Sequence, residues 1–271
     1  MILDPSKLGL LGYALYLQVS NTAKIADIVK YCHKIPELWW INKLIGKYQL
    51  YTLVYIKDVS RLEEIIADIG EKFGKALIDY RLLLLYQGTS SAHNYLYENM
   101  EKIQHDKVRF ASKDAWISNK EIELIHTLAE DPRMSFTSLA KLLKCTLSKA
   151  RSMYEELVEK EVILYIRPSI SGMKLGYIHR HIVIKIKFRA MKHLRTIHEY
   201  LSHQSSAKAV YLTLGRYDII GRFIFKDVDE LRQFKEDFFA RYGDYIRSFF
   251  SDDYYEDKES ESELGIRKIV K

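Results

Sequence analysis

A group of hydroxyl and cationic side chains between residues 146 and 152 carries the clearest chemistry in this sequence. At the start of a helix, Ser, Lys and Arg side chains suit both the phosphate oxygens and the base edges of DNA. The helix N-terminus adds its own preference for phosphate. The candidate DNA-binding residues are Thr146, Ser148, Lys149, Arg151, Ser152 and Arg167. The alternative interpretation is a solvated helix with scattered charge.

The charge around these residues favours a polyanionic partner. Between Gln104 and His203 the sequence holds 18 Lys and Arg against 11 Asp and Glu, an excess of +7, whereas the whole chain has a net charge of +6. A basic middle segment of this kind is typical of a surface that faces nucleic acid. With 48% apolar and 29% charged residues, the chain otherwise has the composition of an ordinary globular protein.

Other residue types that could do chemistry lack the partners that they need. His179 and His181 have the i, i+2 spacing of metal ligands on a strand, but no cysteine or group of carboxylates completes a set. We therefore interpret them as strand-surface histidines and expect no metal. Cys32 and Cys145 have no catalytic context, so we expect both to be packed, in a chain kept in a reducing compartment. No Gly-rich phosphate loop is present. We expect no cofactor.

The elements that position these residues include one unit that occurs twice. Gly46-Lys47-Tyr48-Gln49 and Gly215-Arg216-Tyr217-Asp218 lie 169 residues apart (215 minus 46), and each precedes an apolar run and a Lys-Asp-Val segment. The same offset carries Tyr31 onto Tyr200. An offset kept over roughly 45 residues indicates one supersecondary unit used twice.

The repeated unit predicts a ferredoxin-like fold. In the second copy, a period of two over residues 181–188 predicts a half-buried strand. The residues expected on its buried face are Ile182, Ile184, Ile186 and Phe188. A helix, a hairpin, a second helix capped by Asp229 and a last strand follow; in the first copy Ser60 and Glu63 form the matching capping box. This β-α-β-β-α-β order gives a sheet with helices on one face only. The other face needs a partner, which the other copy supplies within the chain or between chains.

The segment between the two copies predicts a winged helix-turn-helix. Ser118 and Glu121 have the spacing of a capping box and open a first helix that ends before Asp131-Pro132. Ser135 opens a short second helix, and Thr146 caps a third after a tight turn. Residues 162–168 form an extended wing strand. Three helices with a short turn before the third are typical of this DNA-binding unit, although related folds also serve as dimerisation units.

On these motifs the chain resembles the Lrp/AsnC family, the leucine-responsive transcription regulators. The residues that carry the resemblance are Leu139-Ala140, Thr146 with Ser148, Leu157, Val162-Ile163, Leu175-Gly176 and Gly215-Arg216-Tyr217-Asp218. It covers about residues 118–256 and departs from the family at Glu161, where the family has glycine, and at Met153, where the family has a basic residue. The first 88 residues resemble the effector and assembly domain alone. The chain therefore resembles two family units in tandem, of which the first lacks its helix-turn-helix.

The resemblance implies a site for a small effector such as an amino acid. The expected effector-binding residues are Gly215, Tyr217 and Asp218, with Gly46 and Tyr48 as their counterparts in the first copy. In this interpretation the carboxylate of Asp218 holds an ammonium group. The alternative is a turn glycine and a strand-end carboxylate without a ligand.

We therefore expect an α+β protein with two ferredoxin-like βαββαβ domains flanking a winged helix-turn-helix. The expected parts are a ferredoxin-like domain at 1–88, a connector at 89–117, the winged helix-turn-helix at 118–168, a second ferredoxin-like domain at 169–257 and a charged tail at 258–271. No apolar run reaches the roughly 18 residues of a membrane span. We expect a cytoplasmic location and no membrane partner.

The expected function is that of a DNA-binding transcription regulator of the Lrp/AsnC type. Double-stranded DNA is the expected partner, and a single DNA-binding unit per chain favours a homodimer. The chain is not expected to be an enzyme. One alternative is an enzyme like the siroheme decarboxylases, which resemble the same family; the histidines that favour it are His179, His181, His193, His198 and His203. Another is an assembly or effector-binding protein without DNA contact.

Overall fold

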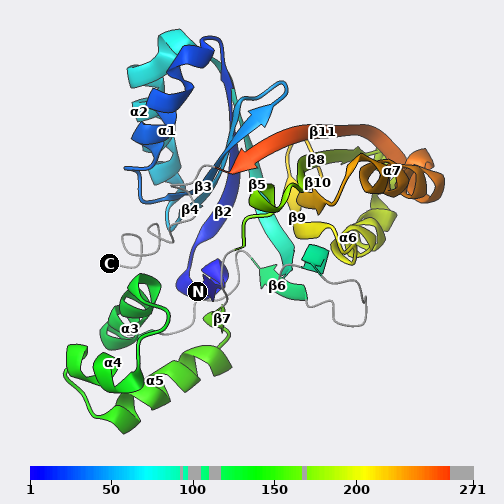
Figure 1. Ribbon diagram of the computed structural model, residues 1–271. Helices are drawn as coiled ribbons and strands as arrows, with labels where there is room; N and C mark the ends of the chain where they lie inside the picture. Colours follow the sequence, from blue (N-terminus) through cyan, green and yellow to red (C-terminus); the bar gives the residue numbers. More distant parts are fainter. Residues whose placement is uncertain (92–93, 97–104, 110–116, 167–169, 257–271) are drawn as a thin grey trace.

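A computed structural model describes residues 1–91, 94–96, 105–109, 117–166 and 170–256 (Figure 1). Both repeats have the predicted β-α-β-β-α-β order. The first contains β2 (Leu11–Val19), α1 (Ile25–Cys32), β3 (Leu38–Ile45), β4 (Leu50–Ile56), α2 (Val59–Phe73) and β5 (Leu77–Ser91). The second contains β8 (Ile178–Ile186), α6 (Leu194–Ser202), β9 (Ala207–Leu214), β10 (Ile219–Phe225), α7 (Val228–Tyr242) and β11 (Ile246–Glu256).

The segment between the repeats follows the predicted order of three helices and a short strand. Its elements are α3 (Asn119–Glu130), α4 (Phe136–Leu142), α5 (Leu147–Glu159) and β7 (Ile163–Tyr165). The remaining strands are β1 (Ile2–Leu3) and β6 (His105–Arg109). Short 3₁₀ helices lie at Pro5–Leu8, Thr22–Lys24, Gly74–Ala76, Asn94–Leu96, Met173–Leu175, Phe188–His193 and Gly243–Tyr245.

The strands of the two repeats form one closed barrel. In the described part of the chain, eight strands follow the order β2-β4-β3-β11-β8-β10-β9-β5, and β5 pairs with β2 to close the ring. The two repeats meet at β3–β11, where Ile45 lies opposite Asp253, and at β5–β9, where Leu84 lies opposite Leu214. Strand β6 pairs with the far end of β5.

Barrel closure corrects the expectation of two separate ferredoxin-like domains. Each repeat was expected to keep its own sheet and to use only the bare face of that sheet as a contact surface. Here the sheet edges also pair, so the backbone N–H and C=O groups of β3, β11, β5 and β9 are satisfied across the boundary between repeats. Joining the edges removes unpaired strand edges and buries both inner faces at the same time.

The four α-helices of the repeats cover the outside of the barrel. Figure 1 shows α1 and α2 against one part of it and α6 and α7 against another. Two apolar clusters lie under these pairs; Leu15 and Ile65 belong to the first, and Ile184 and Phe238 to the second. Within the described residues, no helix is both long and apolar enough to cross a membrane.

Local details differ from the sequence-based expectation at the first strand and at the helix caps. Phe188, expected on the buried face, lies beyond the end of β8 with 93% of its surface exposed. The caps are Asp58, which accepts from Ser60 N, and Asp227, which accepts from Glu230 N. Both lie before the predicted positions because the Lys-Asp-Val segment itself turns into the helix.

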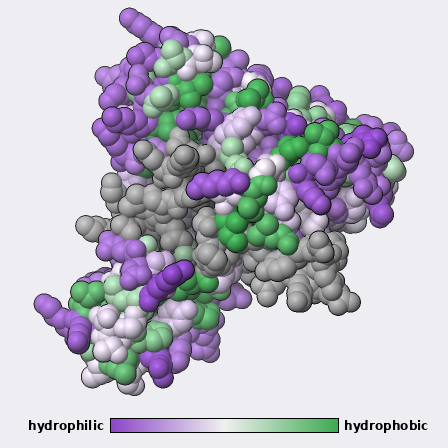
Figure 2. Space-filling view, viewed as in Figure 1, coloured by the Kyte–Doolittle hydropathy of each residue, from purple (hydrophilic) through white to green (hydrophobic). Residues whose placement is uncertain are grey.

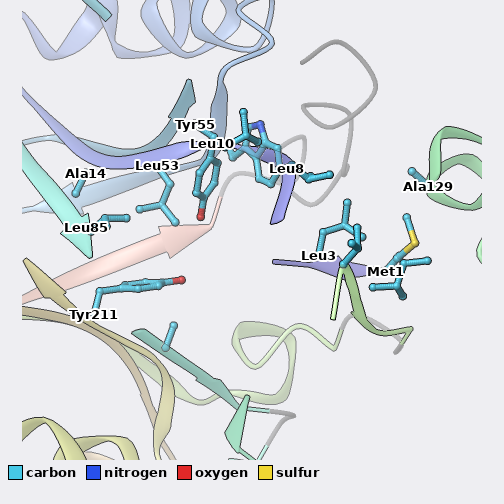
Figure 3. Packing of buried hydrophobic residues seen from close by; sticks show 14 of the residues in the cluster. Met1, Leu3, Leu8, Leu10, Ala14, Leu53, Tyr55, Leu85, Ala129 and Tyr211 are labelled. Atoms are coloured by element: carbon cyan, nitrogen blue, oxygen red, sulfur yellow. The ribbon is translucent and has the colours of Figure 1, made fainter. Parts of the chain in front are cut away.

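The helix-turn-helix unit is joined to the barrel by the first residues of the chain. Strand β1 pairs antiparallel with β7, with Ile2 opposite Tyr165 and Leu3 opposite Ile163. The N–H of Asp4 continues this ladder by donating to the Val162 carbonyl at 3.1 Å. Figure 3 shows Met1 and Leu3 between the barrel residues and Ala129 of α3, a position that makes the unit's core continuous with the barrel interior.

Candidate nucleic-acid interface and barrel interior

Helix α5 presents an accessible first turn. Thr146 is the N-cap, and its side chain accepts from the Lys149 N–H at 3.2 Å. Ala150, Met153 and Leu157 are buried on one side of the helix and anchor it to α3 and α4. The side chains of Ser148, Lys149 and Arg151 are exposed. The predicted reading helix is therefore open to a partner.

The surface around this turn is basic. Residues 132–154 contain five Lys and Arg and no Asp or Glu. All five are exposed: Arg133, Lys141, Lys144, Lys149 and Arg151. Figure 2 shows hydrophilic side chains projecting from the helix-turn-helix unit, away from the barrel. Since no carboxylate from this segment neutralises them, they form a cationic surface, here called the α5 surface.

Two further predicted DNA-binding residues, Arg151 and Ser152, make side-chain contacts within the unit, and one lies outside the described part. Arg151 lies over the ring of Phe136, with Cζ 5.7 Å from the ring centroid, and the residue is exposed. Ser152 is half-buried and donates to Glu156 Oε1 at 2.9 Å. Arg167 falls outside the described residues. The structure thus groups Thr146, Ser148, Lys149 and Arg151 at one end of α5.

The two departures from the Lrp/AsnC pattern have different structural meanings. Met153 is only 2% exposed, so a basic residue there would be buried and the α5 surface loses nothing by its absence. Glu161 has φ of 57°, in the left-handed region that glycine adopts freely. The family pattern has glycine at this position because the backbone is left-handed there, and in this chain a glutamate adopts the same conformation.

The two Gly-x-Tyr turns each pack on the other repeat. Gly215, with φ of 135°, lies over β5; a Cβ added to it would stand 3.1 Å from Leu83 Cδ2. Gly46 lies over β11, where an added Cβ would collide with the carboxylate of Asp252. Leu83 and Asp252 are the seventh residues of β5 and β11. The two turns are therefore equivalent positions of a pseudo-twofold arrangement.

The other expected effector residues are occupied by internal contacts. Asp218 is buried and accepts from Lys185 Nζ and from the Ile186 N–H, both at 2.8 Å. Gln49, its counterpart, accepts from the Val19 N–H at 2.7 Å, so both residues fasten the end of the first strand of their repeat. The side chains of Tyr48 and Tyr217 are buried.

A line of polar side chains crosses the inside of the barrel. Asp252 of β11 lies opposite His181 of β8, and His181 lies opposite Arg222 of β10. His181 Nε2 and the Tyr16 hydroxyl share a hydrogen bond of 2.8 Å. Burial, reinforced by the charge of Arg222, lowers the pKa of His181 to about 3. Burial also raises the pKa of Asp252, with Asp253 adding to the effect.

This line corrects the interpretation of the histidine pair. His179 and His181 were expected on a strand surface, but their exposed fractions are 4% and 1% because both face into the barrel. In the described residues no group of three or more His, Cys, Asp or Glu is placed to hold a metal ion. The alternating pattern placed both histidines on one face, and only the barrel closure turns that face inward.

Strained and unpartnered groups lie beside this line. Trp40 has φ of 49°, an unusual value for a bulky side chain, and Arg222 lies over its ring at 5.7 Å. Asn42 Nδ2 donates to the Trp40 carbonyl at 2.7 Å. The buried polar atoms of the described residues that have no hydrogen-bond partner include His181 Nδ1, Tyr51 Oη and Asn42 Oδ1. Buried polar atoms of this kind are uncommon in folded proteins.

Comparison with known proteins gives similarity at the level of the fold. No protein-family model and no curated protein matches the chain. A structure of the siroheme decarboxylase NirDL matches 98% of this chain and 79% of its own, with a TM-score of 0.64 and 14% identity. NirDL in complex with an iron-uroporphyrin III analogue matches 93% of this chain and 73% of its own, with a TM-score of 0.62 and 14% identity.

Regulators of the Lrp/AsnC type match about half of the chain. E. coli AsnC covers 50% of this chain and 90% of its own, with a TM-score of 0.44 and 21% identity. The expectation that the chain is no enzyme is contradicted, since the two matches over nearly its full length are structures of an enzyme. At 14% identity these matches establish the shared fold and leave the activity to be tested.

Proposed function

We propose that this protein is a transcription regulator of the Lrp/AsnC type that binds double-stranded DNA through the α5 surface. The observation that carries the proposal is an exposed first turn of α5 amid five exposed cations, in a segment of 23 residues (132–154) without a carboxylate. Exposed Lys and Arg at a helix N-terminus neutralise phosphates and release counterions from DNA.

The expected contacts fall into two groups. Lys141 in α4 and Lys144 in the α4–α5 turn precede the first turn of α5, and Arg133 lies in the loop before α4. All three are suited to phosphates, which position the protein without reading sequence. Ser148, on the first turn of α5, faces away from the buried Ala150 and is suited to base edges in the major groove. The described part of the chain carries one helix-turn-helix unit, so a dimer of two chains would bind DNA with two such units.

The test is binding of duplexes selected from a random-sequence pool. Lys149→Ala and Arg151→Ala should each weaken binding and lower the slope of log affinity against log salt by about one if the side chain contacts a phosphate. Lys30→Ala, which removes an exposed cation from α1 on the far side of the barrel, is the matched control and should bind as the unaltered protein does. Unchanged binding in both α5 variants would exclude this helix as the reading element.

A second candidate function is chemistry on a tetrapyrrole, as in the siroheme decarboxylase NirDL, whose structures match nearly the whole chain. The observation that favours it is the line of Asp252, His181 and Arg222, which places an acid, a neutral imidazole and a guanidinium on adjacent strands. Such groups can transfer protons and bind carboxylates.

An absorbance titration with iron-uroporphyrin III tests this second candidate. A spectral shift that is present in the unaltered protein and absent in His181→Gln would support it. The absence of any shift would exclude it, and the DNA-binding proposal would stand independently.

A further inference from the structure

Two leucines at the tip of the helix-turn-helix unit have exposed side chains that do not belong to its apolar core. Leu142, the last residue of α4, is 56% exposed, and Leu147, the first residue of α5, is 48% exposed. The leucines that pack this unit, Leu139 and Leu157, are fully buried. The two exposed side chains flank the turn between α4 and α5 and present apolar surface to a partner.

The charge around these leucines identifies the kind of partner. Lys141 precedes Leu142, Lys144 lies in the turn, and Lys149 follows Leu147, all three with exposed side chains. A partner seated here must offer negative charge and an apolar group together. In the major groove of DNA the phosphates supply the charge, and the C5-methyl of thymine is the apolar group on the base edges.

We propose that Leu147 reads a thymine by packing on its C5-methyl group in the major groove. The inference rests on the proposed function and names the base that this position selects. Leu147 stands one turn before Arg151, and residues four apart share a side of a helix. A phosphate contact by Arg151 would therefore bring Leu147 toward the bases beside it. Leu142 belongs to α4, which lies nearer the sugar-phosphate backbone in helix-turn-helix complexes.

The experiment replaces each thymine of a selected duplex, one at a time, by deoxyuridine, which removes the methyl group and keeps the base pair. For the unaltered protein, one position should cost about four-fold in affinity, the value of one buried methyl group. Leu147→Ala should lose a similar factor on the thymine duplex and show no further loss with deoxyuridine at that position. Leu142→Ala, which changes a leucine of similar exposure, is the matched control and should keep the thymine preference.

The outcomes separate this inference from the proposed function. If the unaltered protein binds no duplex, both the proposed function and the thymine contact of Leu147 are excluded. If it binds duplexes but Leu147→Ala keeps the same penalty for deoxyuridine at every position, the inference alone is overturned. In that case the leucines would have to serve a protein partner, and the α5 surface would still bind DNA. Because Leu147 is exposed, the variant is expected to fold, which circular dichroism would verify.

Discussion

At the scale of single residues, position 161 shows how one backbone angle explains a departure from a family pattern. Glu161 has a left-handed backbone conformation that costs a residue with a Cβ about 1 kcal/mol. Its side chain lies 3.8 Å from Lys7 Nζ and is mostly exposed, so this ion pair contributes little. The conformation is set by the end of α5, where the Glu161 N–H donates to the Val158 carbonyl.

Glu161→Gly should therefore stabilise the protein, by on the order of 0.5–1 kcal/mol in the free energy of unfolding. Urea denaturation measures the change. Glu161→Gln is the control, because it removes the charge and keeps the Cβ, and it should give no gain. A larger stability in the glutamine variant than in the glycine variant would show that charge repulsion, rather than the backbone angle, is the cause.

A second residue-scale prediction concerns His181 and pH. Burial lowers the pKa of its folded form to about 3, against an ordinary 6.5. As the pH falls, His181 is therefore protonated near pH 6.5 in the unfolded chain but only near pH 3 in the folded protein. The contribution of neutral His181 to the free energy of unfolding is fully present above pH 6.5. It is lost as the pH falls from 6.5 toward 3, by up to about 1.4 kcal/mol per pH unit.

Urea denaturation at pH 7, 6 and 5 tests this dependence. His181→Gln should have a shallower loss of stability across this range than the unaltered protein. His203→Gln, which changes an exposed histidine on the outside of the molecule, should retain the original slope. Identical slopes in the unaltered protein and in His181→Gln would contradict the assignment of the pH dependence to this residue.

At the scale of elements, the helices of the inserted unit were predictable and the strand that holds it was not. The capping box of Ser118 and Glu121 and the cap at Thr146 are local signals, and both are present in the structure. Strand β1 has two residues and pairs with residues more than 150 positions away, as in Leu3 with Ile163. Two residues contain no period, so no local pattern could reveal this pairing.

The β1–β7 pairing predicts a graded response to truncation at its two residues. Leu3 is buried and Ile2 is half-buried. Leu3→Ala should cost about 2–4 kcal/mol and speed hydrogen exchange at Ile163 and along α5, because a cavity opens beneath β7. Ile2→Ala is the matched control and should have a clearly smaller effect. Equal, small effects of both variants would show that the unit holds its place without the N-terminal strand.

At the scale of the whole molecule, the fixed offset predicted the repeat, and the period of two predicted the strands and their faces. Neither signal could reveal that β3 pairs with β11 and β5 with β9. The same alternation fits two sheets packed face to face and one sheet closed on itself, because both bury the same faces. The consequences reach the site, since the inward position of His179 and His181 depends on the closure.

The contact of Gly46 with Asp252 tests how strongly the two repeats are coupled. Gly46→Ala should destabilise the protein by about 1 kcal/mol, the low end for overpacking, because its Cβ would push the Asp252 carboxylate aside across the boundary. Asp252→Ala should relieve this loss, and the double-mutant cycle should give a coupling of about 0.5–1 kcal/mol. Gly70→Ala is the control. It lies within α2 with open space around it and should stabilise by about 0.5–1 kcal/mol. Additive effects of the two substitutions would contradict direct contact.

Because both halves of the barrel belong to one polypeptide, each half can change alone. In an assembly of identical subunits, every substitution appears in all copies. Here the fourth residue of β8 is His181, whereas the fourth residue of β2 is Ala14, and Asp252 likewise stands where the first repeat has Leu83. At these two positions the second repeat carries a histidine and an aspartate where the first carries an alanine and a leucine, a difference between halves that a homodimer of single repeats could not encode.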